Sequence, residues 1–93
     1  MDLDTIASKI SQRLSGSGFS RTVKVDLKDE GSILIDGETA TAGDGEADCT
    51  ITISKDNFAD LISGDLSPTT AFMTGKMKIA GDMGAAMALG QAL

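Results

Sequence analysis

The 93-residue sequence has no histidine, tryptophan or tyrosine, and it contains one cysteine, one proline and three phenylalanines. Without histidine no Ser-His-Asp triad can form, and zinc lacks its commonest ligand. Cys49 cannot form an internal disulfide, and no histidine is present to activate its thiol. It occupies the apolar parity of a predicted strand, so we interpret it as a buried structural residue. We therefore expect no catalytic residue, no metal site and no cofactor.

Basic residues are also scarce, with 8 Lys and Arg against 14 Asp and Glu and a net charge of -6. This balance excludes the basic stripe that nucleic-acid binding needs, and it argues against simple electrostatic docking on an anionic membrane. The acidic stretch 36–48 lacks the spacing of a calcium loop and indicates a solvated loop. The lone cysteine, and the lack of a signal peptide or an apolar run that could span a bilayer, favour a cytoplasmic location.

The length predicts a single domain over residues 1–93. Apolar residues at helical spacing predict a helix from Leu3 to Leu14, begun by Asp2 or Asp4, and strict alternation predicts a strand from Phe19 to Lys28. The next apolar alternation, 32–35, forms a hairpin with that strand, and 38–42 is a short edge strand. The remaining elements are a strand over 48–53, a helix from Ser54 to Gly64, a short helix from Ser67 to Gly75, a strand over 76–79 and a helix after Asp82. We expect their apolar faces to share one interior between a sheet face and the helices.

Four of the five methionines, Met73, Met77, Met83 and Met87, fall within fifteen residues on apolar positions of consecutive elements. Methionine serves as ordinary core filler, but as a group these flexible side chains are typical of a wall that repacks around variable apolar shapes. The final segment, Met83 to Leu93, carries no charge. A helix that is apolar all round must cover a cavity, meet another protein chain or contact lipid.

These residues resemble the sterol carrier protein type 2 (nonspecific lipid-transfer) domain. The match runs through Ala47-Asp48-Cys49-Thr50-Ile51-Thr52, Phe58, Leu61, Gly64, Pro68, Ala71-Phe72, Gly75-Lys76-Met77-Lys78-Ile79, Gly81, Met83-Gly84 and Ala86-Met87. The resemblance implies an α+β fold with a five-stranded, largely antiparallel sheet, about four helices covering one face, and an apolar tunnel between them. It implies binding of fatty acid, fatty acyl-CoA, phospholipid or sterol without catalysis.

The chain departs from the longer family members in two ways. The sequence ends at Leu93, where longer members continue into a tail with a peroxisomal signal, so we expect a member without that tail; it also has Ser32-Ile33-Leu34-Ile35 where they often carry an aromatic residue. We therefore expect a compact, bacterial-type member, with a fatty acyl chain as the favoured ligand and a sterol as the least favoured.

Two functions are compatible with these patterns. The first is a lipid-binding or transfer module whose ligand is an acyl chain or acyl-CoA, with transient membrane or enzyme contact. Its predicted wall comprises Phe58, Leu61, Ile62, Phe72, Met73, Met77, Ile79, Met83 and Met87. The second is a protein-interaction or dimerisation module with a filled core and an apolar C-terminal helix. We expect a monomer or a weak homodimer.

Overall fold

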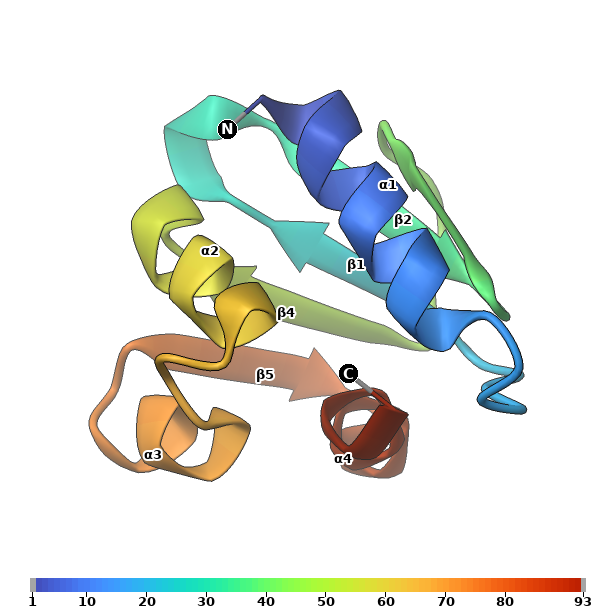
Figure 1. Ribbon diagram of the computed structural model, residues 1–93. Coiled ribbons are helices and arrows are strands. Elements are labelled where there is room, and N and C mark those ends of the chain that lie inside the picture. The colour runs from blue at the N-terminus through green and yellow to red at the C-terminus, as the bar shows by residue number, and fades with distance from the viewer. Residues whose placement is uncertain (1, 93) are drawn as a thin grey trace.

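The computed structural model describes residues 2–92, which form a five-stranded sheet with four helices against one face (Figure 1). The helices are α1 (Leu3–Leu14), α2 (Lys55–Ser63), α3 (Pro68–Met73) and α4 (Met83–Ala92). The strands are β1 (Thr22–Asp26), β2 (Ser32–Asp36), β3 (Thr39–Ala42), β4 (Cys49–Ile53) and β5 (Met77–Gly81), with a 3₁₀ turn, η1 (Lys28–Glu30), after β1. The predicted α+β class and five-stranded sheet are confirmed.

The sheet is open and has the strand order β3-β2-β1-β4-β5. Neighbouring strands are antiparallel except for β1 and β4, which run parallel at its centre. The predicted hairpin and edge strand are both present, as β1-β2 and β3. The first strand is shorter than predicted at both ends, since it begins at Thr22 and ends at Asp26, where the backbone of Leu27 (φ -91°, ψ 28°) leaves the extended conformation to start η1.

Helix starts follow the capping residues that the sequence indicates. Asp2 accepts a hydrogen bond from the amide of Thr5 at 2.8 Å, so it caps α1. Ser54 and Ser67 cap α2 and α3 in the same way, and Pro68 occupies the first position of α3. Gly64 ends α2 in the left-handed conformation.

The core lies on one side of the sheet. Alternate residues of the strands, such as Val23, Ile35 and Ile51, are buried there, while their neighbours face the other side. Buried side chains of α1, α2 and α4 cover this face, and α3 adds Ala71. The polar Ser11 of α1 joins the edge strand by accepting a hydrogen bond from the amide of Ala40 at 2.8 Å.

The expectation that all apolar faces share this interior is wrong for four side chains. The exposed fractions are 45% for Phe72, 78% for Met73, 45% for Met83 and 62% for Met87. The short α3 turns only Ala71 fully inward, and α4 packs through Ala85, Ala86 and Leu89. Leu93, the end of the uncharged segment, lies outside the described residues. No helix within residues 2–92 is long and apolar enough to cross a bilayer.

Gly81 joins β5 to α4 at a site that excludes a side chain. Its φ is +96°, and a Cβ there would lie 2.6 Å from the carbonyl oxygen of Asp48. We expect Gly81→Ala to lower the free energy of unfolding by more than about 2 kcal/mol, because left-handed strain and a backbone clash add together. Gly16→Ala is the control, since its φ is +77° but its Cβ would meet nothing within 4 Å. Urea unfolding measures both, and equal losses would contradict the clash.

Candidate functional site

Two adjoining cavities lie on the helix side of the sheet. The first, here called the inner cavity, has a volume of about 230 Å³ and lies between β4, β5, α2 and α4. Most of its wall is apolar, and Arg13 at the end of α1 is the one charged residue that lines it. Its lining residues are Arg13, Ile51, Phe58, Leu61, Gly64, Leu66, Ser67, Pro68, Met77, Ala86, Leu89 and Gly90.

The second, here called the outer groove, has a volume of about 450 Å³ and lies between α3, β5 and α4. No charged side chain lines it. Its lining residues are Pro68, Thr69, Phe72, Met77, Ile79, Met83, Ala86, Met87, Gly90 and Gln91. The two cavities share Pro68, Met77, Ala86 and Gly90, so they are neighbours separated by these four residues.

The predicted wall residues divide between these cavities. Phe58 and Leu61 line the inner cavity, and Met77 lines both cavities. The outer groove is also lined by Phe72, Ile79, Met83 and Met87. Ile62 is buried in the core and lines a separate depression beside Lys9 and Arg13. Met73 lines none of these cavities and extends into solvent.

Several lining residues were not in the predicted wall. Ala86 and Leu89 follow the apolar spacing of the last helix and could have been found from it. Gly90 has no side chain, and a Cβ there would lie 3.3 Å from the Cβ of Pro68. This close approach of α4 to the start of α3 occurs where the two cavities meet. Nothing in the sequence pattern indicates that α4 approaches α3 so closely, and nothing in it indicates that Arg13 lines the inner cavity.

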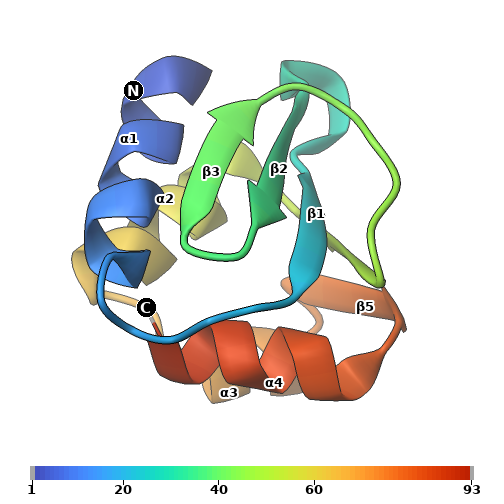
Figure 2. The same ribbon diagram turned by 90° about the vertical axis from the view of Figure 1, so that its right-hand side faces the viewer.

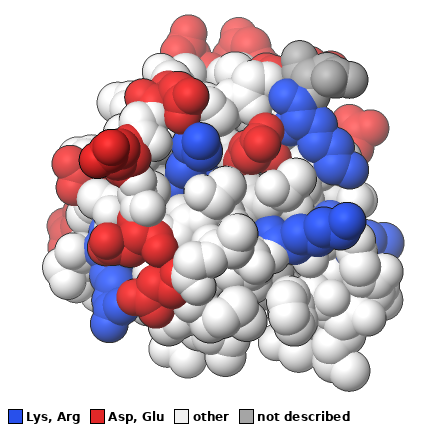
Figure 3. Space-filling view, turned by 180° about the vertical axis from the view of Figure 1, so that it is seen from behind, with Lys and Arg blue, Asp and Glu red and all other residues white. Residues whose placement is uncertain are grey.

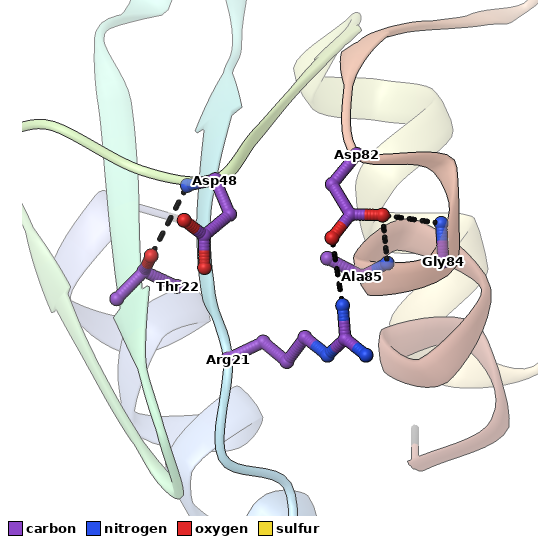
Figure 4. A network of polar contacts seen from close by, with 6 residues as sticks. All are labelled: Arg21, Thr22, Asp48, Asp82, Gly84 and Ala85. Carbon is purple, nitrogen blue, oxygen red and sulfur yellow. Dashed lines mark hydrogen bonds and ion pairs between the residues drawn. The ribbon is translucent and has the colours of Figure 1, made fainter.

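A polar network fixes the start of α4, the helix that both cavities share (Figure 4). Arg21 donates to one carboxylate oxygen of Asp82 at 2.7 Å, and the other oxygen caps α4 by accepting from the amide of Gly84 at 2.9 Å. The amide of Asp82 donates to the carbonyl of Asp48, whose own amide is held by Thr22. The predicted cap by Asp82 is confirmed, and α4 is anchored to Arg21 and Asp48, the residues that directly precede β1 and β4.

The cavities offer little for catalysis. Cys49 is buried on β4, and burial followed by the negative charge of Asp82 raises the pKa of its thiol. Residues 2–92 hold no cluster of three or more His, Cys, Asp or Glu side chains that could bind a metal. The arrangement suits an apolar molecule, with the exposed cation of Arg13 beside the inner cavity.

Fold and site thus define a small α+β domain with an apolar site between one sheet face and its helices. Residues 2–93 match the SCP-2 sterol transfer family, and the chain belongs to this lipid-transfer family. The rat protein "Sterol carrier protein 2" is 44% identical over 73 residues, which cover 77% of this chain and 12% of the rat protein. The chain therefore spans a small part of the length of this rat protein and of the other curated relatives it matches.

Solved structures share the fold at low sequence identity. Sterol Carrier Protein 2 Like 2 from Aedes aegypti superposes with a TM-score of 0.80 at 18% identity, covering 96% of this chain and 94% of the mosquito chain. Sterol Carrier Protein-2 from the same mosquito, solved in complex with palmitate, gives a TM-score of 0.76 at 20% identity, with 92% and 88% covered. The predicted family and architecture are confirmed.

The raised pKa of Cys49 gives a test of its structural role. A buried thiol with a raised pKa stays protonated at pH values where the unfolded thiol, with an ordinary pKa near 9.0, ionises. Burial of the protonated thiol thus contributes to the free energy of unfolding. This contribution is complete below the pKa of the unfolded thiol and is lost as the pH rises through the raised pKa of the folded thiol. We expect iodoacetamide to label native protein at least about ten-fold more slowly than urea-unfolded protein at mildly alkaline pH. Rapid labelling of the folded protein would contradict a buried, inert thiol.

Proposed function

We propose that this chain holds the acyl chain of a fatty acid, fatty acyl-CoA or phospholipid in the inner cavity and outer groove, and carries it without catalysis. The observation that carries the proposal is the pair of adjoining apolar cavities between the sheet and the helices, with Met77 in the wall of both. In this reading the four shared residues form a passage, and movement of the flexible Met77 side chain joins the two spaces into one tunnel.

The energetics of burial support an acyl chain as ligand. Each buried methylene contributes about 0.8 kcal/mol, so ten methylenes supply about 8 kcal/mol. That is the free energy of a micromolar complex before the cost of association, so a long chain that occupies both cavities binds better than a short one.

Arg13 favours an anionic head group. It is the one charged residue along the inner cavity, and residues 2–92 give it no ion pair. Its guanidinium suits a carboxylate or a phosphate, which a bidentate hydrogen bond recognises well. The palmitate held by the mosquito relative is a ligand of this class, although that relative shares 20% identity with this chain.

The alternative function, a dimerisation module with a filled core, is less well supported. It requires α3 and α4 to pack solidly on β5, whereas the outer groove separates them. The exposed methionines are compatible with either function, so a measurement of lipid binding distinguishes the carrier from the dimerisation module.

Substitutions along the groove test the proposal. Phe72 and Met83 are each about half exposed, so Phe72→Asp and Met83→Asp should fold while placing a charge in the outer groove. We expect each to weaken binding of a fluorescent fatty acid at least ten-fold, because losing one large apolar contact costs about 1.5–3 kcal/mol. Fluorescence titration measures the affinity, and circular dichroism verifies folding.

Met73→Asp is the matched control. It introduces the same charge at the end of α3 but outside both cavities. We expect its affinity to equal that of the unsubstituted protein. An equal loss of affinity in all three variants would show that charge near α3, and not the groove, controls binding. No saturable uptake by the unsubstituted protein would refute the proposed function.

A further inference from the structure

The sheet ends in two edge strands, β3 and β5, which differ in how their outward backbone groups are occupied. At β3 the hydroxyl of Ser11 accepts a hydrogen bond from the amide of Ala40 at 2.8 Å and donates one to its carbonyl at 3.1 Å, so α1 covers the middle of this edge. An edge strand with unpaired amides and carbonyls is a template for a further strand. The state of β5 therefore decides whether the sheet can be extended.

The register of β5 turns the backbone of Ile79 outward. The amide of Asp82 donates to the carbonyl of Asp48 at 2.9 Å, so these opposed residues form a hydrogen-bonded pair. Such pairs alternate with unbonded pairs along an antiparallel ladder, so the even-numbered residues of β5 bond to β4 and the odd-numbered ones face the edge. The amide and carbonyl of Ile79 thus point away from β4. Among residues 2–92, no turn, loop or side-chain hydrogen bond takes either group.

This edge lies beside the outer groove. The side chain of Ile79 lines the groove, whose other walls are α3 and α4. Figures 1 and 2 show β5 as the last strand of the sheet, with α3 and α4 at the same lower end of the molecule. A strand that pairs with Ile79 would place every second side chain on the helix side of the sheet, in this groove. Because no charged side chain lines the groove, those side chains must be apolar.

The opposite side of β5 carries positive charge. Lys78 alternates with Ile79 and therefore lies on the outer side of the sheet, and Lys76 immediately precedes the strand. Both lysines are exposed, and neither forms an ion pair within residues 2–92. No acidic residue occurs between Asp65 and Asp82. Figure 3, which looks onto this outer side, shows acidic side chains over the upper and left parts, above a largely uncharged lower part.

We infer that β5 is a peptide-binding edge, which takes an extended segment of a partner protein in which apolar residues alternate with acidic ones. The backbone of the segment pairs with the amide and carbonyl of Ile79, its apolar side chains enter the outer groove, and its acidic side chains lie beside Lys78. A second copy of β5 fits this edge poorly, because it brings further lysines and no acidic residue. The inference goes beyond the proposed function and does not depend on a bound lipid.

Hydrogen exchange of backbone amides, measured by NMR on lipid-free protein, tests strand addition. The probe is a blocked seven-residue peptide that alternates valine with glutamate. At saturation we expect exchange of the Ile79 amide to slow at least about ten-fold, because that amide gains a hydrogen bond. The amide of Ala80 already faces β4 and should keep its rate.

A peptide of the same sequence, N-methylated at every second amide along its backbone, is the matched control. It keeps both sets of side chains but cannot pair with the edge, so we expect it not to bind. Equal binding of the methylated peptide, or an unchanged exchange rate of the Ile79 amide at saturation, would overturn strand addition. Protection of this amide that grows with protein concentration in the absence of peptide would overturn the peptide as occupant and assign the edge to a second copy.

Lys78→Glu tests the acidic character of the partner. We expect this variant to bind the glutamate peptide at least about five-fold more weakly, and a peptide with lysine in place of glutamate more tightly, because directly opposed charges repel or attract. Lys9→Glu, on α1, changes the net charge equally and should keep the preference of the unsubstituted protein for the glutamate peptide. Equal effects of the two substitutions would show that net charge alone controls binding and would overturn the assigned edge.

Discussion

The rest of this structure depends on the burial of one sheet face beneath helices whose inward-facing side chains differ in size. Under α1 the face meets the large side chains of Ile6 and Ile10, which line neither cavity. Beneath α3 and α4 it meets mainly alanines, because Ala71, Ala85 and Ala86 are the side chains these helices turn inward, together with Leu89. Small side chains leave space that larger ones would occupy. The cavities are thus a consequence of composition at one end of the chain.

Because side-chain packing around the cavities is loose, the position of α4 must be fixed by contacts other than apolar packing. Asp82 provides this hold, since it pairs with Arg21, caps α4 and links through its amide to β4. Gly81 permits the tight turn that brings Asp82 to this point. The start of α4 is therefore anchored by polar contacts, while its apolar body remains beside the groove.

Much of this fold could be predicted from local patterns. Ser54 and Ser67 indicate helix starts, and the alternation around Ile51 and Ile79 indicates strands, since both signals act over a few residues. The parallel pairing of β1 with β4 could not be predicted in this way, because it joins segments about 25 residues apart.

The site was only partly predictable for a similar reason. Met73 has the same composition signal as Met87, but the six-residue α3 turns it away from the groove, and the contact of Gly90 with Pro68 depends on the placement of two helices.

The central claim is that an acyl chain occupies the space beside Met77, and labelled methionine methyl groups test it most directly. Three methionines, at 77, 83 and 87, line the cavities, whereas Met73 lies on the same end of the molecule but outside them. Titration of methyl-labelled protein with palmitate, followed by NMR, should shift the three cavity methyl signals in a saturable one-to-one manner and leave the Met73 signal in place. Shifts confined to Met73, or equal non-saturating shifts of all four signals, would contradict a bound acyl chain in these cavities.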